Sequence, residues 1–412
     1  MESVVIVDAC RTAVGKYGGT LKPLTAADLA VAVMKASVER SGISPDEIDE
    51  VDFGQCRQTS DFSNLARYAA LKAGIPEEVP GNTVMCACAS GMLAVRDGMY
   101  SILLGGNKVV LAGGAESMTN AHFYLSTARW GVGTGNAELK DSLTEAQFCS
   151  QPADLYGRFN MGITAENVAE KYHISRENQD RFALASQQKA ADAIREGRFR
   201  DEIIPLTVPQ GRKKPPVVFD TDEFPRETSM EQLAGLKPAF WDGGTVTAGN
   251  SSGRNDGASA LMLASESSAR HPGLPSARGS YASHRGLPVL ARIRGIAEAG
   301  VDPRYMGMGP VFAVEKVMEQ TGLSLADMEL IELNEAFAAQ SVACIREMGL
   351  ENRMDRINVN GGAISLGHPI GSSGSRIMAT LLHEMRRRGM RLGLATLCVA
   401  GGMGMAAVLE TV

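Results

Sequence analysis

The sequence predicts an α/β protein made of two similar halves, each with a mixed, mostly parallel sheet covered by helices. Short apolar runs with the length of buried strands alternate with segments of helical period, a pattern typical of sheets covered on both faces. Several segments also recur 280 positions later, which indicates one α/β unit used twice. The 412 residues are enough for two large halves with ample core.

The first half alternates strands and helices from its beginning. Residues 4–7 form an apolar run typical of a buried strand, and residues 27–40 have helical period and stop just before Gly42, a typical helix-ending residue. Ser44 followed by Pro45 predicts the start of a further helical turn. We expect the next strands at 51–53 and 109–112 and the next helix at 64–73.

The regular alternation of short apolar runs and helical segments is interrupted between residues 121 and 244. Two charged helices are expected there, near 164–172 and 176–196, followed by an irregular stretch. We interpret 121–244 as an inserted loop domain that could cover a site. The predicted division is a first half over 1–268, with its core at 1–120 and 245–268, and a second half over 269–412, which opens with a Gly-, Pro- and Ser-rich linker at 271–287.

The internal repeat can be recognised directly in the amino-acid sequence. Residues 39–44 resemble residues 319–324, which sets the shift at 280 positions. The same shift places the strand predicted at 51–53 on the apolar run at 331–333. Two such units usually pack together with a site between them.

The bulk composition excludes several classes of protein. Lys and Arg number 41 against 47 Asp and Glu, so the net charge of −6 offers no broad basic surface for nucleic acid. No apolar run is long enough to span a membrane. Seven cysteines without disulfide spacing suit a reducing compartment, and the first residues already resemble a strand, so we expect no signal peptide and a cytoplasmic protein. Nothing completes a zinc site with Cys86 and Cys88, and no metal is expected.

Cys88 is the first candidate nucleophile. It lies in a run of small residues at 86–91 that opens a segment of helical period, so we expect it at a helix start. Unpaired N–H groups and the positive end of the helix dipole favour the thiolate there, and the thiolate is the reactive form of cysteine. The alternative is that Cys88 is a small buried apolar residue.

The shift of 280 positions pairs Cys88 with His368. His368 lies in a glycine-rich loop and is followed by Pro369, which fits the first position of a helix. If the halves pack about a pseudo-twofold axis, both helix starts could point into one pocket. A cysteine activated by a histidine is a standard arrangement for covalent catalysis. A purely structural histidine is the alternative.

Two further candidates follow predicted strands in the second half. Cys398 comes after the apolar run at 392–397, and Asn334 comes after the run at 330–333. Because α/β sheets bind ligands at strand ends, Cys398 could act as an acid or base, and the Asn334 amide could hold a water or an oxyanion. The alternatives are a buried structural thiol at Cys398 and a helix cap at Asn334.

Together these motifs resemble the thiolase family, and within it the acetyl-CoA acetyltransferase branch, over nearly the whole chain. The resemblance depends on the order and spacing of short stretches in addition to those around Cys88, His368 and Cys398. These stretches are 11–12, 113–118, 161–166, 249–253 and 334–337. The resemblance implies the five-layer αβαβα fold of that family.

The resemblance also implies a role for each candidate. Cys88 takes the acyl group as a thioester, and His368 lowers the pKa of the Cys88 thiol. His368 and a water held by Asn334 form one oxyanion site, and the backbone N–H groups of Cys88 and Ala400 form another. Cys398 removes a proton from the methyl group of acetyl-CoA or returns it. The implied reaction joins two acetyl-CoA into acetoacetyl-CoA and CoA by a ping-pong route, with CoA thioesters as substrates and no cofactor.

Substrate contacts and assembly are implied in the same way. The residues matching the pantetheine tunnel are Met161, Ser252, Ala336 and Phe337, and Arg226 matches a position near the adenine. The loop at 129–131 resembles the one that joins two dimers in tetrameric thiolases, so a homotetramer is expected. The chain departs from the family pattern at Met85 and Cys86, at Asn160, and at Ala400, where a glycine is usual.

Three other functions stay open at this point. A 3-ketoacyl-CoA thiolase acting on longer chains would use the same residues. A decarboxylating ketosynthase would need a second histidine where this chain has Asn334. A CoA- or lipid-binding relative without turnover would tend to lose the catalytic residues that this chain keeps.

Overall fold

The protein is built around a long mixed sheet, and the computed structural model describes residues 2–211, 213–270 and 287–412. The strand order is β13-β14-β15-β12-β1-β11-β5-β3-β4. The first half supplies β1 (Val4–Thr12), β3 (Glu50–Gly54), β4 (Gly81–Val84), β5 (Val109–Ser117) and β11 (Asn255–Ser265). The second half supplies β12 (Ala291–Gly300), β13 (Leu330–Leu333), β14 (Leu392–Val399) and β15 (Met403–Thr411). The linker predicted at 271–287 lies outside the described residues, except for Leu287.

The strand order is nearly symmetric about the middle of the sheet. β3 pairs with β5 in parallel as β13 does with β14, and the pairs β5–β11 and β14–β15 are both antiparallel. The two halves meet between β1 and β12, where the register joins Val5 to Arg292 and Ile6 to Ala291. Each half therefore carries its own mixed sheet, as the repeat in the sequence predicts, and the short β1–β12 pairing joins the two sheets edge to edge.

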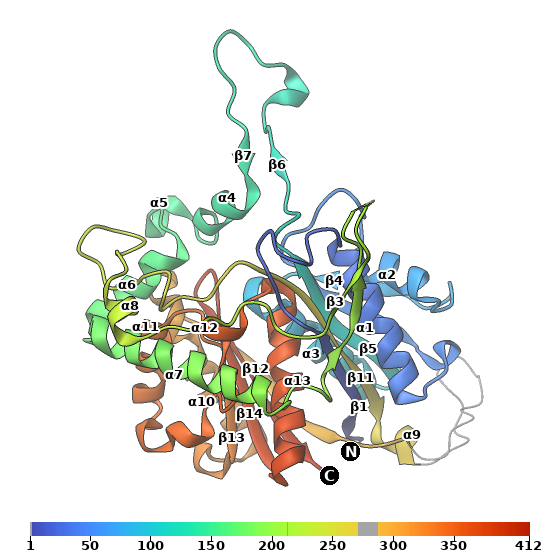
Figure 1. Ribbon diagram of the computed structural model, residues 1–412. Coiled ribbons are helices and arrows are strands. Elements are labelled where there is room, and N and C mark those ends of the chain that lie inside the picture. Colours follow the sequence, from blue (N-terminus) through green and yellow to red (C-terminus); the bar gives the residue numbers. More distant parts are fainter. Residues whose placement is uncertain (1, 212, 271–286) are drawn as a thin grey trace.

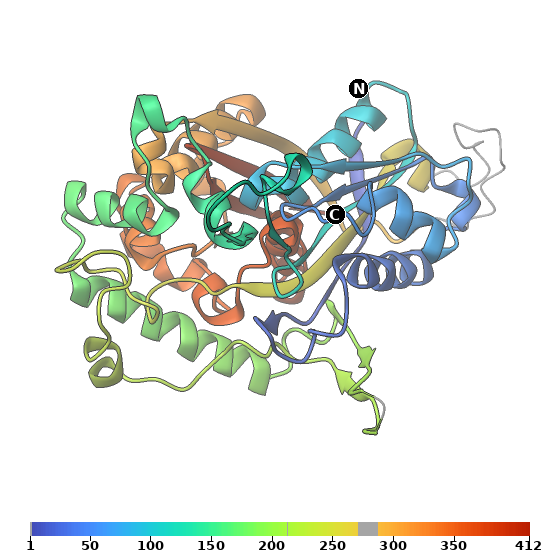
Figure 2. The ribbon, with the colours of Figure 1, turned by 90° about the horizontal axis from the view of Figure 1, so that it is seen from above.

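Helices cover the two sheets in three layers. α1 (Ala26–Ser41) and α2 (Leu65–Ala73) pack on the outer face of the first sheet, and α10 (Gly309–Thr321) and α11 (Ala338–Glu347) pack on the outer face of the second. α3 (Ser90–Leu103) and α13 (Ile370–Arg388) pack against each other between the sheets. The halves lie side by side in Figure 2. The expected layered α/β fold is confirmed.

The side chains of β1 belong alternately to two cores. Val5 and Val7 pack with α1 and α2, whereas Val4 and Ile6 pack with α3 and α13. Successive side chains of a strand point to opposite faces, so a strand covered on both faces needs apolar residues at every position. This explains the continuous apolar run at the start of the chain.

Matching helix ends show the repeat at the level of single residues. Gly42 follows α1 and Gly322 follows α10, and both have left-handed backbone with φ of 71° and 68°. Each is followed by a serine, Ser44 or Ser324, that forms a capping box with a carboxylate three residues later. The same local interactions therefore turn the chain at equivalent points in both halves.

Residues 121–244 add elements around one side of this core. Within the described part of that region, only β8 (Ile203–Ile204) joins the large sheet, beside β1. The β6–β7 hairpin extends away from the body of the protein (Figure 1). The strands are β6 (Phe123–Tyr124), β7 (Lys140–Asp141), β9 (Leu206–Val208) and β10 (Val217–Phe219), and the helices are α4 (Ser142–Phe148), α5 (Ala153–Tyr156), α6 (Met161–Lys171), α7 (Arg176–Arg195) and α8 (Met230–Ala234).

Three short elements complete the chain, and none of the helices resembles a membrane span. The short elements are β2 (Gly15–Lys16), α9 (Glu266–Arg270) and α12 (Ala363–Leu366). Among the helices that the structure describes, none is both long and apolar enough to cross a membrane.

The starts of α3 and α13 are in close contact in the central layer. A Cβ atom on Gly91, in the first turn of α3, would clash with the Ser375 hydroxyl and would lie 3.0 Å from the Gly371 carbonyl oxygen. Only glycine allows this approach. Because Cys88 and His368 come just before these two helices, the contact brings both predicted catalytic residues to one place.

Candidate active site

One cavity of about 300 Å³ brings most of the predicted site residues together. Cys88, His368 and Ala400 line it, and so do four predicted substrate-binding residues, Met161, Ser252, Ala336 and Phe337. The region 121–244 also forms part of the wall, through Leu143, Ala146, Gln147, Ser150, Met161 and Phe240. The cavity therefore lies where the two halves and this region meet.

Cys88 lies in a short 3-10 turn, η2 (Ala87–Ala89), that leads directly into α3. The Ser90 hydroxyl fixes this turn, because it accepts the N–H of Cys86 at 2.9 Å and donates to the Ala87 carbonyl at 2.7 Å. Ala87 has a φ of 42°, a left-handed conformation that is uncommon for alanine and is often found at functional sites. The Cys88 sulfur is half-buried, and its own backbone N–H and that of Ala400 both lower the pKa of the thiol.

The surroundings of Cys88 favour the neutral thiol. Burial raises the pKa of the Cys88 thiol above its ordinary value, and this effect outweighs the Ala400 N–H and the positive charge of Arg57, which lower the pKa. The backbone N–H groups favour the thiolate, but loss of solvation has the larger effect on the pKa. A base is needed to remove the thiol proton.

The ring of His368 is oriented by Ser373, in the first turn of α13. Nδ1 lies 2.5 Å from the Ser373 oxygen, and the Ser373 hydroxyl donates its single proton to the Pro369 carbonyl at 2.9 Å. Nδ1 must therefore carry the ring proton and donate it to Ser373. The other nitrogen, Nε2, is buried and has no hydrogen-bond partner among the described residues. Nε2 is thus the nitrogen that can accept a proton.

Burial also keeps His368 neutral. It lowers the pKa of the imidazole from 6.5 to about 3, and the nearby positive charge of Arg376 acts in the same direction. At neutral pH the pair is therefore a thiol and an uncharged imidazole. Such a pair transfers its proton when the sulfur attacks, rather than before substrate arrives.

Lowering the pH from about 7 to about 5 is expected to destabilise the protein through His368. The unfolded imidazole binds a proton below its ordinary pKa of 6.5, whereas the folded one stays neutral down to about pH 3. The unfolded state therefore binds more protons in this window, and stability falls as pH falls, by about 2 kcal/mol. Urea unfolding at both pH values measures this loss. The His368→Gln variant should lose about 2 kcal/mol less than the wild type, and an equal loss would show that His368 titrates normally.

Asn334 directly follows β13, and Cys398 lies near the end of the neighbouring strand β14. Both are almost fully buried. Burial, together with the neighbouring Cys88, raises the pKa of the Cys398 thiol well above its ordinary value. The helix-cap alternative for Asn334 is wrong, because α11 begins after Phe337. Both polar atoms of the Asn334 side chain are buried and have no partner among the described residues. The amide is therefore available to a hydrogen-bonding ligand.

The predicted substrate-binding residues form one wall, with one exception. The Ser252 N–H donates to the Ala336 carbonyl at 3.0 Å, which joins the two motifs that carry these residues. Arg226 does not line this cavity and lies instead along a separate hollow. There its N–H donates to Gln187 at 3.0 Å and its guanidinium donates to the Ala248 carbonyl at 2.9 Å.

Two residues that line the cavity, and one residue beside it, are not assigned a role by the sequence. Arg57 and Arg254 line it, although both lie in loops without periodicity. Glu116 accepts the N–H groups of Cys56, Arg57 and Gly371 at 2.9 to 3.1 Å, which ties the Arg57 loop to the start of α13. Burial raises the pKa of Glu116 to about 7. The sequence shows the 113–118 motif that contains Glu116. It does not show the role of Glu116, because hydrogen bonds from backbone N–H groups leave no pattern in the sequence.

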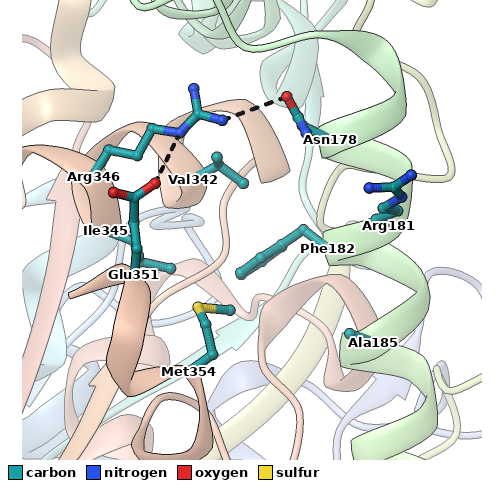
Figure 3. Close-up of a pocket in the computed structure, with 9 residues that line it drawn as sticks. All are labelled: Asn178, Arg181, Phe182, Ala185, Val342, Ile345, Arg346, Glu351 and Met354. Atoms are coloured by element: carbon teal, nitrogen blue, oxygen red, sulfur yellow. Dashed lines mark hydrogen bonds and ion pairs between the residues drawn. The ribbon is translucent and has the colours of Figure 1, made fainter. Parts of the chain in front are cut away.

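A third cavity, a hollow between α7 and α11, is lined by no described cysteine or histidine (Figure 3). Its Arg346 lies 3.5 Å from the Glu351 carboxylate and 3.5 Å from the Asn178 oxygen, so its charge is already partnered. Among the described residues, no group of three or more His, Cys, Asp or Glu side chains could hold a metal ion. Of these three cavities, only that of Cys88 has a cysteine and a histidine among its described lining residues.

Known proteins match the chain along its whole length. The thiolase N-terminal domain model matches residues 4–267 and the thiolase C-terminal domain model matches 287–411. Acetyl-CoA acetyltransferase from Pseudomonas aeruginosa is 50% identical over 410 residues, 99% of each chain. Among solved structures, Bacillus anthracis acetyl-CoA acetyltransferase is 45% identical with a TM-score of 0.93, and human mitochondrial 3-ketoacyl-CoA thiolase is 40% identical with a TM-score of 0.91. Both alignments cover 100% of this chain and 99% of the other.

Proposed function

The chain belongs to the thiolase family, and from that premise we propose that it is an acetyl-CoA acetyltransferase that carries the acyl group on Cys88. The observation behind this proposal is one cavity that holds the Cys88 thiol, the ring of His368 and the backbone of Ala400. A nucleophile, a base and an oxyanion donor are the parts that acyl transfer requires. The name of the relative that is 50% identical supports the same activity.

In the direction of thiolysis, the first half-reaction begins at Cys88. The sulfur attacks the 3-keto carbon of acetoacetyl-CoA while Nε2 of His368 takes the thiol proton. The bond between C2 and C3 then breaks, and the acetyl group stays on Cys88 as a thioester. The electron pair of the broken C2–C3 bond stays with C2, so acetyl-CoA departs as its enolate. Cys398 gives its thiol proton to the carbon of that enolate, which releases acetyl-CoA.

The second half-reaction returns both protons. The Cys398 thiolate takes the proton of the CoA thiol, and the CoA sulfur attacks the acetyl carbonyl on Cys88. Cys88 leaves and takes back the proton held on Nε2 of His368. A second acetyl-CoA is released, and synthesis follows the same steps in reverse. The substrates are acetyl-CoA, acetoacetyl-CoA and CoA, and the scheme uses no cofactor.

Two sets of donors are proposed to stabilise the negative oxygens. The N–H groups of Cys88 and Ala400 both favour negative charge at the Cys88 sulfur, and they would face the oxygen of the tetrahedral intermediate. Once Nε2 of His368 has taken the thiol proton, it becomes a donor itself. Together with a water held by the Asn334 amide, it would face the thioester oxygen of the enolate. One such donor contributes about 10²–10³ in rate.

A 3-ketoacyl-CoA thiolase for longer chains is the second candidate. It is favoured by the match to human mitochondrial 3-ketoacyl-CoA thiolase over the full length of this chain, at 40% identity. That enzyme class uses the same steps, so the two candidates differ only in the acyl group that the cavity accepts. Chain length is therefore the property that separates them.

Purified protein is expected to cleave acetoacetyl-CoA when CoA is added, because the site holds all the groups required for thiolysis. Loss of the enolate absorbance of the substrate measures the rate. We expect kcat/KM to be about 10-fold higher for acetoacetyl-CoA than for 3-ketohexanoyl-CoA, since poorly fitted methylenes cost that much in a small pocket. A preference for 3-ketohexanoyl-CoA would favour the second candidate. Cleavage of neither substrate would contradict both.

We also propose the organisation expected from the sequence. The first half is taken as 1–268 with the inserted loop domain at 121–244, and the second half as 269–412. The 129–131 loop exposes Trp130 (89% exposed), and Phe123 of the adjoining β6–β7 hairpin is 58% exposed, which supports a contact between copies and a homotetramer. A cytoplasmic location is part of this proposal.

A further inference from the structure

Buried polar atoms without partners gather between β13 and the beginning of α13. On the β13 side they are Oε1 of Glu332 and both polar side-chain atoms of Asn334. On the α13 side they are Nε2 of His368 and all three guanidinium nitrogens of Arg376. None of these atoms has a hydrogen-bond partner among the described residues, and the four residues are at most 6% exposed. Because a buried polar group without a hydrogen bond is costly, such a cluster indicates a hydrogen-bonding ligand.

Glu332 and Asn334 lie on the face of β13 that α13 covers. Side chains alternate between the two faces of a strand. Leu330 packs with α13 in the central layer, whereas Ile331 and Leu333 pack in the outer core. The backbone stays paired beyond the end of β13, since the Asn334 N–H donates to β14 at 2.9 Å. Glu332 and Asn334 therefore continue the side of the strand that begins with Leu330.

Arg376 faces the same layer from α13. It comes three residues after Ser373, which orients the ring of His368, so Arg376 and Ser373 lie on one side of the helix. Burial is the main influence on the pKa values of His368 and Glu332, lowering the first and raising the second. The charge of Arg376 lowers both. Arg376 is therefore close to the catalytic imidazole and to the unpartnered acid of β13.

The first half of the protein carries an acid and an arginine at the same two positions. The shift of 280 positions pairs Glu332 with Asp52 and Arg376 with Arg96. In that half, the Asn82 amide donates to Asp52 at 3.1 Å. The Arg96 guanidinium contacts two acidic side chains, at 2.8 and 3.1 Å. Protein groups thus bind both side chains in the first half, whereas the equivalent pair beside the catalytic residues is left open.

Water fits this space better than an ion does. The charges that act on Arg376 are those of Arg11 and of the three carboxyl groups of Glu332, Asp222 and Glu202, so no surplus of positive charge would hold an anion. The guanidinium of Arg376 would itself repel a cation. Water can accept from the N–H groups of Arg376 and donate to the carboxyl group of Glu332. Two residues of strand span about 7 Å, so about two waters fill the distance from Glu332 to Asn334.

We propose that Arg376 and Glu332 bind a short file of buried water molecules, and that the water held by the Asn334 amide is the last member of this file. The inference rests on the proposed function and extends its enolate site inward. The first water accepts from Arg376 and donates one proton to Glu332 and the other to the next water. That second water donates to the enolate oxygen, and hydrogen-bonded chains polarise one another. Arg376 and Glu332 are thus positioning residues that act through water.

The experiment compares two rates in each variant. Exchange of the methyl protons of acetyl-CoA with solvent deuterium requires the enolate, whereas acetylation of Cys88 by acetyl-CoA uses the other oxyanion site. In Arg376→Met we expect exchange to fall by about 10-fold or more and acetylation to change by less than about 3-fold, because only the enolate site loses its support. In Glu332→Gln exchange should fall by a smaller factor, since the amide still binds water. Arg96→Met, the equivalent change in the first half, should leave both rates within about 2-fold.

Two further measurements remove the dependence on a single buried substitution. If Arg376→Met does not fold, the double variant Arg376→Met/Glu332→Leu replaces the pair by apolar side chains and should show the same selective loss of exchange. A high-resolution crystal structure of the wild type should show ordered waters within hydrogen-bond distance of Arg376, continuous with the water on Asn334.

Three results would overturn this inference while the proposed function stands. An equal loss of exchange and acetylation in the Arg376 variants would show a purely structural role. Normal exchange in a folded Arg376→Met protein would show no role in the enolate step. A direct ion pair between Arg376 and Glu332, or a chloride ion at Arg376, would exclude the file of water. A wild type that shows neither exchange nor acetylation would instead remove the proposed function.

Discussion

Replacement of Cys88 by alanine is expected to abolish acyl transfer, with kcat for acetoacetyl-CoA thiolysis reduced by about 10⁴-fold or more. No other group in the described cavity is expected to form the thioester, because Cys56 is the only other cysteine that lines it and burial raises the pKa of its thiol well above the ordinary value. The loss is measured by steady-state thiolysis and by the absence of an acyl-enzyme after rapid mixing.

Cys86→Ala provides the matched control for this variant. Cys86 is two residues away, half-buried and packed against the same central core, but it does not line the cavity. Its removal should cost less than about 10-fold in kcat, since only packing is lost. If Cys86→Ala lost acyl transfer and Cys88→Ala kept it, the nucleophile would be Cys86 and the assignment to Cys88 would be wrong.

Replacement of Cys398 by alanine is expected to separate the two halves of the chemistry. Cys88 and His368 remain, so the protein should still become acylated by acetyl-CoA. Exchange of the methyl protons of acetyl-CoA with solvent deuterium should fall by about 10²–10⁴-fold, because the acid–base group is missing. Nuclear magnetic resonance of acetyl-CoA in deuterated buffer measures the exchange.

Cys344→Ala is the control for Cys398→Ala. Cys344 is equally buried in the same outer core, where its thiol donates to the Gly307 carbonyl at 3.2 Å. Both substitutions create a similar small cavity, so a difference between them reflects chemistry rather than stability. Normal proton exchange in Cys398→Ala would remove the acid–base role from this thiol.

The fold could be predicted in large part because local and global signals agree. Gly42 and Gly322 end equivalent helices with the same backbone conformation, and the matching stretches around them give the shift that connects Cys88 with His368. Helix limits followed their periodicity closely, as for α7, which ends at Arg195 against an expected 196. The apolar run at 4–7 reflects burial on both faces of β1. Repeats and hydrophobic periodicity are properties of the amino-acid sequence, so they can be detected without a structure.

The electrostatics of the site could not be predicted, because they depend on burial. The helix start at Cys88 favours the thiolate, but desolvation has the larger effect and raises the pKa of that thiol. The proton on Nδ1 of His368 follows from Ser373 and Pro369, whose geometry no spacing reveals. Glu116 binds the loop that carries Arg57 to the cavity through the backbone N–H groups of Cys56 and Arg57. Contacts to the backbone carry no residue signature, so such features appear only in the structure.

The most direct test of the central claim is to locate the acyl group. The wild type is mixed with acetyl-CoA, quenched in acid and digested, and the peptides are fragmented in a mass spectrometer. We expect one acetyl group, held as a thioester on Cys88, that disappears when CoA is added before the quench. An acetyl group on Cys86 or Cys398, or an unmodified protein that still turns over acetoacetyl-CoA, would contradict the account.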